Sequence, residues 1–195
     1  MSAIPKQDDA YFYWKFDNDV DSDTCKKIIS IADKKWEKAT TKGKKGQDNR
    51  KTNICWTTEQ WLYDLVFDYM HTANKNAGWN FEIDGAESMQ IGRYGKGCFY
   101  DTHHDGNGTS LYNIPDNKWL HNKTRKLSMS ILLNDDYEGG GFKFVDDIDN
   151  PIGIGGNGTK GTVIVFPSYH SHSVEKVTKG IRYSLVVWFL GKGFK

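Results

Sequence analysis

Residues 161–189 read GTVIVFPSYHSHSVEKVTKGIRYSLVVWF, and their composition is typical of buried β-strands. It contains two runs rich in Val, Ile, Phe and Tyr, at about 162–167 and 182–190, joined by a polar segment with two histidines. Such side chains fit a pleated, half-buried strand, and Gly and Ser bound the runs. Similar runs predict further strands at about 87–94, 98–104, 127–133 and 142–145.

The residues before this region have a helical pattern. Apolar side chains recur three or four positions apart over residues 21–38, where Asp21 or its neighbour can cap the first turn. A capping-box pattern, Thr57 with Gln60, predicts a second helix that runs to about residue 73. The N-terminal part is therefore expected to be helical.

Helices followed by strands favour an α+β fold, mainly β, with helices packed on one sheet of a jelly roll (a double-stranded β-helix). We expect a single domain over residues 1–195, with its helical part at about 20–78 and its jelly-roll core at about 80–195. Two polar connections, 106–126 and 146–161, are long for a compact domain, and loops of that length are usually functional or disordered.

Composition excludes several classes of protein. The 26 Lys and Arg residues nearly balance 25 Asp and Glu residues, so no global field points to a nucleic-acid or membrane partner. The first residues lack a signal-peptide pattern, and no apolar stretch is long enough to cross a bilayer. The three cysteines, Cys25, Cys55 and Cys98, are far apart and odd in number, which argues against a disulfide framework. We expect a cytoplasmic protein.

Four of the six histidines fall in two short segments, YDTHHD and YHSH. On a strand, side chains two residues apart share a face, so His103 and Asp105 can point at one metal ion while His104 points away. The pair alone is a weak signal, because a histidine near an aspartate is common. A histidine from another strand, either His170 or His172, would complete two imidazoles and one carboxylate, the facial set of non-haem Fe(II) oxygenases.

Two stretches resemble those of a known family. YGKGCFYDTHHD (residues 94–105) resembles the Y-x-x-G-x-x-Y-x-x-H-x-D motif of prolyl 4-hydroxylases and related 2-oxoglutarate oxygenases. Residues 161–189 resemble their F-P-S…H-x-V…V-T-x-G-x-R…W segment, and the resemblance covers about 80–195. It implies His103, Asp105 and His172 as Fe(II) ligands, with no catalytic side chain beyond the metal centre, and leaves His170 at the entrance or exposed.

The resemblance also implies a cosubstrate pocket. Arg182 matches the family residue that pairs with the distal carboxylate of 2-oxoglutarate, and a buried carboxylate does need a charged, forked partner. Ser184 and Trp188 alternate with it on the same strand face, where a hydroxyl donor and a pocket wall are expected. Tyr94 matches a tyrosine near the cosubstrate, or is a core aromatic. Some members have a second tyrosine where this chain has an Ile-Leu pair at 131–132, so that side of the pocket departs from the pattern.

The implied function is an Fe(II)- and 2-oxoglutarate-dependent dioxygenase that uses O2, hydroxylates prolyl residues in a peptide or protein, and releases succinate and CO2. Ascorbate is a further candidate cofactor. Aromatic residues in the 106–126 loop, Tyr112, Trp119 and His121, are expected to grip such a substrate. The alternatives are a hydroxylase of a free amino acid or small metabolite, a non-catalytic metal-binding jelly roll, and a zinc hydrolase. No membrane or nucleic-acid partner is indicated.

Overall fold

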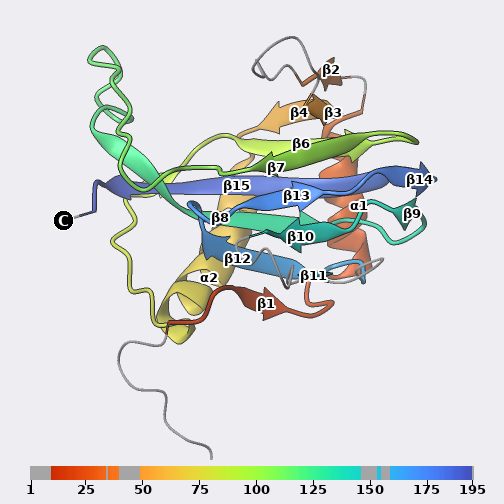
Figure 1. The fold of residues 1–195 in the computed structure, drawn as a ribbon, viewed down its shortest axis with the longest axis horizontal. Coiled ribbons are helices and arrows are strands. Elements are labelled where there is room, and N and C mark those ends of the chain that lie inside the picture. Colours follow the sequence, from red (N-terminus) through yellow and green to blue (C-terminus); the bar gives the residue numbers. More distant parts are fainter. Residues whose placement is uncertain (1–9, 34, 40–48, 146–152, 155–158, 195) are drawn as a thin grey trace, which may run out of the picture.

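Two antiparallel sheets form the body of the protein. The structure is a computed structural model that describes residues 10–33, 35–39, 49–145, 153–154 and 159–194. The larger sheet has the order β1 (Trp14–Phe16), β12 (Val163–Pro167), β8 (Lys123–Leu132), β15 (Arg182–Lys192), β6 (Met89–Tyr94), β4 (Asn53–Thr57) and β2 (Glu37–Lys38), and β5 (Gly85–Ala86) also pairs with β15. The smaller sheet has the order β11 (Gly153–Ile154), β10 (Phe142–Phe144), β13 (His172–Val174), β7 (Phe99–His103) and β3 (Arg50–Lys51). A short ladder joins β9 (Glu138–Gly139) to β14 (Val177–Lys179) (Figure 1).

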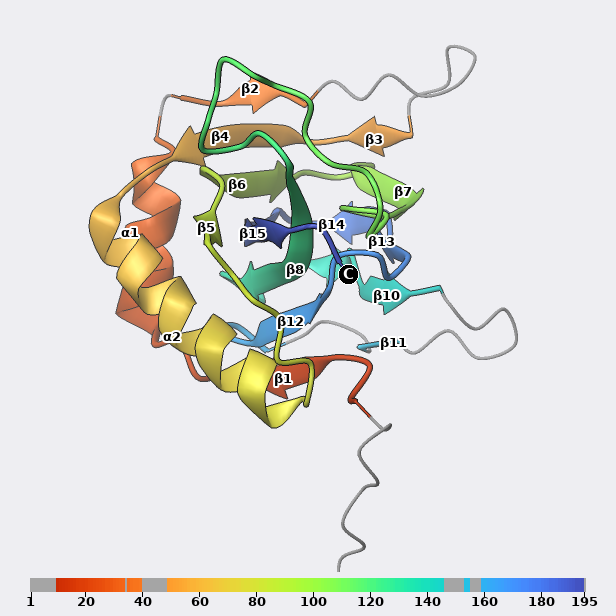
Figure 2. The same cartoon turned by 90° about the vertical axis from the view of Figure 1, so that its left-hand side faces the viewer.

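Helices α1 (Ser22–Ile31) and α2 (Gln60–Asn76) cover the outer face of the larger sheet, and the smaller sheet lies on its other side (Figure 2). Strand alternation explains this layering. Leu185, Val187 and other odd-numbered residues of β15 pack with the helices in the main core, while its even-numbered residues face the smaller sheet. A second cluster, which includes Phe144 and Phe166, fills the space between the sheets. The expected mainly-β jelly roll with helices on one sheet is confirmed.

Several boundaries differ from the sequence expectations. The first helix ends at Ile31, before the expected residue 38. The apolar period misleads here because it continues into Ala32 and Trp36, which pack on the core without being helical. The predicted capping box is wrong, because Thr57 belongs to β4, opposite Met89. The N-cap of the second helix is Glu59, which makes no side-chain cap hydrogen bond. The last residues of the expected 106–126 loop belong to β8, which pairs with β15 as far as Lys123. Most of the 146–161 connection lies outside the described residues.

The N-terminal part also contributes strands. No strand was expected at β1 or β4, yet both extend the larger sheet. Neither described helix is long and apolar enough to cross a membrane.

Gly161 ties the N-terminal segment to the sheet. Its carbonyl accepts from the backbone N–H groups of Asp19 and Val20, each at 3.1 Å, and its own N–H donates to Leu132 at 2.8 Å. Its φ is +83°, and a Cβ there would collide with the carbonyl of Val20. Only glycine suits this position.

We therefore expect Gly161→Ala to lower the free energy of unfolding by about 1–3 kcal/mol from backbone strain, with more from the collision. Urea denaturation would show this as a lower midpoint. Gly95→Ala is the matched control, because a Cβ at Gly95 meets nothing within 4 Å, and its change should stay within about 0.5 kcal/mol. Equal midpoints for the two variants would contradict this role of Gly161.

Candidate metal centre and cosubstrate pocket

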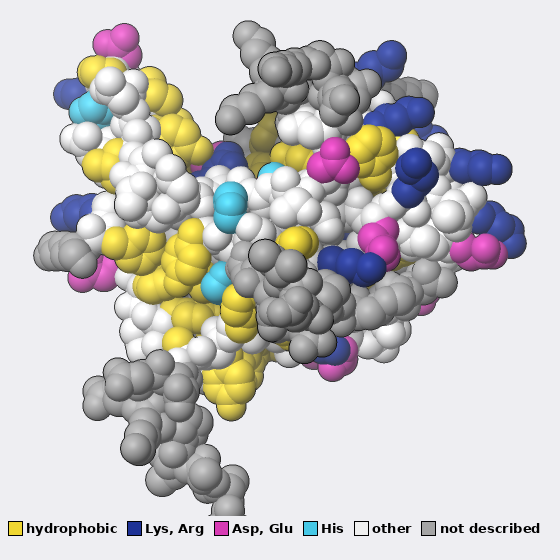
Figure 3. Space-filling model, viewed as in Figure 1, with side chains coloured by type: hydrophobic (Ala, Val, Ile, Leu, Met, Phe, Trp, Pro, Cys, Tyr) yellow, Lys and Arg dark blue, Asp and Glu magenta, His cyan; other side chains and the backbone are white. Residues whose placement is uncertain are grey.

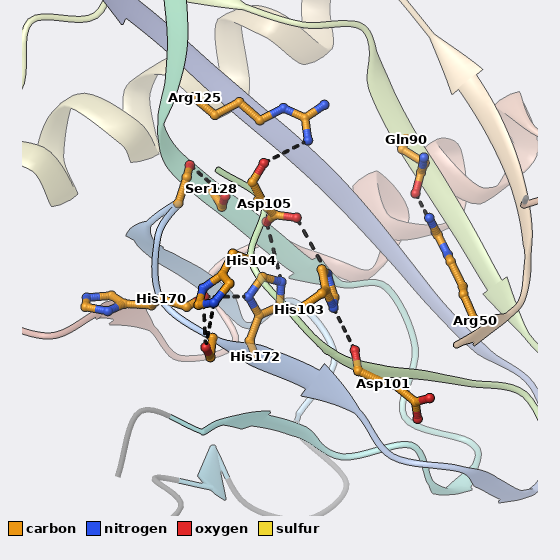
Figure 4. A network of polar contacts seen from close by, with 12 residues as sticks. Arg50, Gln90, Asp101, His103, His104, Asp105, Arg125, Ser128, His170 and His172 are labelled. Atoms are coloured by element: carbon orange, nitrogen blue, oxygen red, sulfur yellow. Dashed lines mark hydrogen bonds and ion pairs between the residues drawn. The ribbon is translucent and has the colours of Figure 1, made fainter. Parts of the chain in front are cut away.

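Two neighbouring strands bring the three expected metal ligands together. In the smaller sheet β13 pairs with β7, and His172 lies directly opposite His103. Asp105 follows β7 by two residues, and its side chain reaches the same point as the two imidazoles (Figure 4). One ligand atom from each residue can be chosen so that all lie within 4.8 Å of one another.

Hydrogen bonds fix the orientation of both rings. Nδ1 of His103 lies 2.8 Å from the carbonyl oxygen of Asp101, and Nδ1 of His172 lies 2.9 Å from that of His170. Each Nδ1 therefore carries the proton, which leaves the Nε2 lone pairs free for a metal. The Nε2 atoms lie 3.6 Å and 3.4 Å from the two carboxylate oxygens of Asp105. Ligands about 2.1 Å from an ion and at right angles lie about 3 Å apart, so the spacing suits three adjacent positions around one metal.

The electrostatics of the triad fit a cation. The Asp105 side chain is only 7% exposed, and its buried Oδ2 accepts no hydrogen bond. Burial raises the pKa of Asp105, but the imidazoles of His172 and His103 outweigh burial and hold that pKa well below its usual range. Burial lowers the pKa of His172, which favours its neutral, metal-binding form. A carboxylate that stays ionised while buried needs positive charge beside it.

The other two histidines do not join the group. His104 is exposed, and its Nδ1 lies 2.8 Å from the carbonyl oxygen of Tyr169. The ring of His170 stacks on Phe12 with centroids 3.8 Å apart. His170 therefore supports the site through its carbonyl group, which holds the ring of His172.

Arg182 lies in the same pocket as the triad. It is 3% exposed, and its Nη1 donates to Oγ of Ser184 at 3.1 Å. Its Nε has no acceptor, and no carboxylate among the described residues forms an ion pair with it. Tyr94 lies opposite Arg182 in the β6–β15 ladder, with the guanidinium carbon 5.4 Å from its ring centroid. A buried guanidinium with a spare donor fits a carboxylate ligand.

One ion pair beside the metal ligands was not foreseen. Nε and Nη2 of Arg125 donate to the two carboxylate oxygens of Glu87, at 2.7 Å and 2.6 Å. Nη1 of Arg125 donates to the carbonyl oxygen of Asp105 at 3.2 Å (Figure 4). The guanidinium lies 4.0 Å from the ring centroid of Trp188. Arg125 lies in the segment 106–126 that the sequence predicts to be a loop, and no spacing pattern links it to a glutamate 38 positions earlier.

The three aromatic residues expected to grip a substrate are dispersed. The hydroxyl of Tyr112 donates to Glu87 at 2.7 Å, and burial is the main cause that raises its pKa to about 12. Trp119 is 43% exposed, with the ammonium of Lys123 over its ring at 4.9 Å. His121 is half-buried in the same loop. Tyr112 lines a cavity that also reaches Asp105 and Arg125. Substrate binding by this set stays a prediction.

Comparisons with known proteins agree with this geometry. The family model of the 2OG-Fe(II) oxygenase superfamily matches residues 89–190. A search of curated proteins gave no match. Among solved structures, the chain is similar to a viral collagen prolyl hydroxylase from Paramecium Bursaria Chlorella virus-1, with a TM-score of 0.68, 18% identity, and coverage of 94% of this chain and 98% of that one.

Two further solved structures share the fold. A Pseudomonas putida prolyl-4-hydroxylase has a TM-score of 0.67 and 17% identity, covering 93% of this chain and 94% of that one. A prolyl hydroxylase from Trichoplax adhaerens, in complex with a hypoxia inducible factor peptide fragment, has a TM-score of 0.63 and 14% identity, covering 91% and 83% respectively. At these identities the likeness establishes the jelly-roll fold.

We predict that alanine at any one of His103, Asp105 or His172 lowers Fe(II) affinity by at least about 100-fold, because each removes one of three ligands. Anaerobic titration of the apoprotein with Fe(II), followed by calorimetry, measures this. His104→Ala and His170→Ala are the controls, and both should retain the wild-type affinity. If His170→Ala abolishes iron binding while His172→Ala does not, the third ligand is wrongly assigned.

Proposed function

This chain belongs to the 2OG-Fe(II) oxygenase superfamily, and on that premise we propose that it hydroxylates prolyl residues in a peptide or protein. Enzymes of this superfamily use Fe(II), 2-oxoglutarate and O2. The observation that carries the proposal is one pocket that contains the candidate metal-binding triad and the Arg182 guanidinium, which has no carboxylate partner among the described residues. The hydroxylase structures with the same fold add support for a prolyl substrate.

The side chains of the pocket have distinct roles in this proposal. His103, Asp105 and His172 would hold Fe(II) on one face and leave the other positions open. Bound Fe(II) would supply the oxidative chemistry that consumes 2-oxoglutarate and O2 and yields succinate, CO2 and a hydroxylated product. Arg182 and Ser184 would hold the distal carboxylate of 2-oxoglutarate. Buried apolar neighbours, Phe142, Phe166 and Val174 among them, would keep water from the metal.

A surface suited to an extended peptide begins beside the metal ligands. Trp188 is 7% exposed and has Arg125 over its ring, whereas Trp56, on the same sheet face, is 44% exposed. The two indole centroids lie 6.0 Å apart. In an extended peptide, side chains two residues apart share a face and lie about 6.6 Å apart. A substrate side chain over the exposed Trp56 would therefore leave its neighbour two positions away close to Trp188 and Arg125.

The loop of residues 106–122 stands beside this surface. Figure 3 shows the loop projecting from the body of the protein, with hydrophobic and basic side chains gathered at its foot. A cavity of about 340 Å³ lies at its base, lined by Leu111, Tyr112 and Arg125 among others. The loop would therefore wall the peptide surface, with the hydroxyl of Tyr112 held on Glu87.

We also propose a cytoplasmic location. The three cysteines, Cys25, Cys55 and Cys98, are free thiols, and cytosolic proteins normally keep their thiols reduced.

The central test is turnover with Fe(II), 2-oxoglutarate and ascorbate. We expect proline-containing peptides to stimulate succinate release and to gain one oxygen atom on proline, both seen by mass spectrometry. A panel of free amino acids and metabolites runs in parallel. Product from that panel, with none from a broad set of prolyl peptides, would leave the oxygenase assignment standing and contradict the peptide substrate. Hydrolysis without O2 would contradict both.

A second prediction concerns the peptide surface. Trp56→Ala removes an exposed ring that is not part of the metal or cosubstrate pocket, so it should raise the KM for peptide by about 2- to 13-fold, the value of one lost aromatic contact. Peptide-free decarboxylation of 2-oxoglutarate should be unchanged. Tyr11→Ala is the control, since Tyr11 is 53% exposed and packs on Trp14. An equal rise of KM in both variants would contradict a specific role for Trp56.

A further inference from the structure

The Arg182 guanidinium lacks the strand tyrosine that some related oxygenases place beside it. Ile131 is fully buried in the core on the helix side of the larger sheet. Leu132 pairs with Ser184 across the β8–β15 ladder and offers only an apolar side chain. Neither residue therefore supplies a donor for a carboxylate, although Ser130, further along β8, also lines the pocket.

Tyr137 reaches Arg182 from a different element. It is 5% exposed and lies just before β9. A methyl group on Gly140 would lie 3.1 Å from Cδ of Arg182 and 3.3 Å from Cε2 of Tyr137, so both side chains border one glycine. Burial raises the pKa of Tyr137, and the adjacent guanidinium of Arg182 opposes that rise. The phenol and the guanidinium are therefore neighbours in a water-poor environment.

The segment that carries Tyr137 is fixed to both sides of Arg182. Nδ2 of Asn134 donates to the carbonyl oxygen of Ile181, and its Oδ1 accepts from the N–H of Tyr183, both at 2.7 Å. The β9–β14 ladder holds the other end of the segment. These contacts place the Tyr137 ring independently of any ligand.

Glycine allows the close approach on which this placement depends. Gly180 has a φ of +74°, and a Cβ there would lie 2.7 Å from the carbonyl oxygen of Asp136 and 3.1 Å from Cα of Tyr137. The turn before β15 therefore packs directly on the backbone of Tyr137, and a larger residue would push the two apart.

We propose that Tyr137 is the third donor for the distal carboxylate of 2-oxoglutarate, beside Arg182 and Ser184, in place of a tyrosine on β8. A phenol oxygen can accept from the guanidinium and still donate its own proton to a carboxylate. The Ser184 hydroxyl, which accepts from Arg182, can do the same. The inference rests on the proposed binding of 2-oxoglutarate at Arg182 and is independent of the substrate that is hydroxylated.

The test is Tyr137→Phe, which keeps the ring and removes only the hydroxyl. Calorimetry on Mn(II)-loaded protein measures binding of 2-oxoglutarate and of oxalate, without turnover. Oxalate can chelate the metal but has no distal carboxylate. We expect the Kd of 2-oxoglutarate to rise about 10- to 100-fold, as for a lost hydrogen bond to a charged group, and the Kd of oxalate to change less than about twofold.

Two further variants calibrate the measurement. Arg182→Ala should raise the Kd of 2-oxoglutarate by about 100-fold or more and leave oxalate binding nearly unchanged. Tyr183→Phe should change neither, because Tyr183 faces the other side of β15 and packs near Trp36, with ring centroids 6.0 Å apart.

The outcomes separate the two proposals. If Arg182→Ala weakens the binding of 2-oxoglutarate but Tyr137→Phe does not, the proposed role of Tyr137 is wrong and the proposed function stands. If Tyr137→Phe weakens the binding of oxalate as much as that of 2-oxoglutarate, the substitution acts through the metal site or the fold, and the inference is overturned. If neither Arg182→Ala nor Tyr137→Phe affects 2-oxoglutarate, the proposed binding at Arg182 fails as well.

Discussion

Two buried charges of opposite sign in one pocket constrain the rest of this protein. Asp105 and Arg182 are both nearly inaccessible to water, and neither forms an ion pair with the other. A buried charge that is not fully compensated is costly, so ligands that bind Asp105 together with its two imidazoles, and Arg182, should stabilise the fold. A divalent cation suits the carboxylate and its two imidazoles, and a dicarboxylate that reaches from that cation suits the guanidinium.

The jelly roll makes this arrangement possible because each central strand has two different faces. The odd-numbered residues of β15 are apolar and packed under the helices, so they stabilise the sheet whatever the pocket contains. The even-numbered residues, Arg182, Ser184 and Trp188 among them, carry the polar and aromatic groups of the pocket. Stability and chemistry are thus assigned to alternate positions of the same strand, which is why a short sequence pattern can report on both.

That alternation also explains how much could be predicted from sequence. The grouping of His103 with Asp105, and the shared face of Arg182 and Ser184, follow from strand periodicity and a family motif. Arg125 with Glu87 and Arg182 with Tyr137 could not be predicted, because these contacts depend on which strands become neighbours. The end of the first helix was mispredicted for a different reason. Apolar spacing indicates which residues are buried, and it continues after Ile31, where the helix ends.

The 106–122 loop has a base fixed by contacts of Glu87 and a tip that lies beyond them, and the two parts should differ in their tolerance to substitution. Backbone hydrogen bonds between Tyr112 and Lys123, and between Asn122 and Tyr112, close the neck of the loop. Below the neck, Tyr112 shares the Glu87 carboxylate with Arg125, which in turn supports the backbone of Asp105. Residues 113–121 can therefore vary in length and composition without disturbing the metal ligands. New binding specificities could arise in this tip while the chemistry beneath it is inherited unchanged.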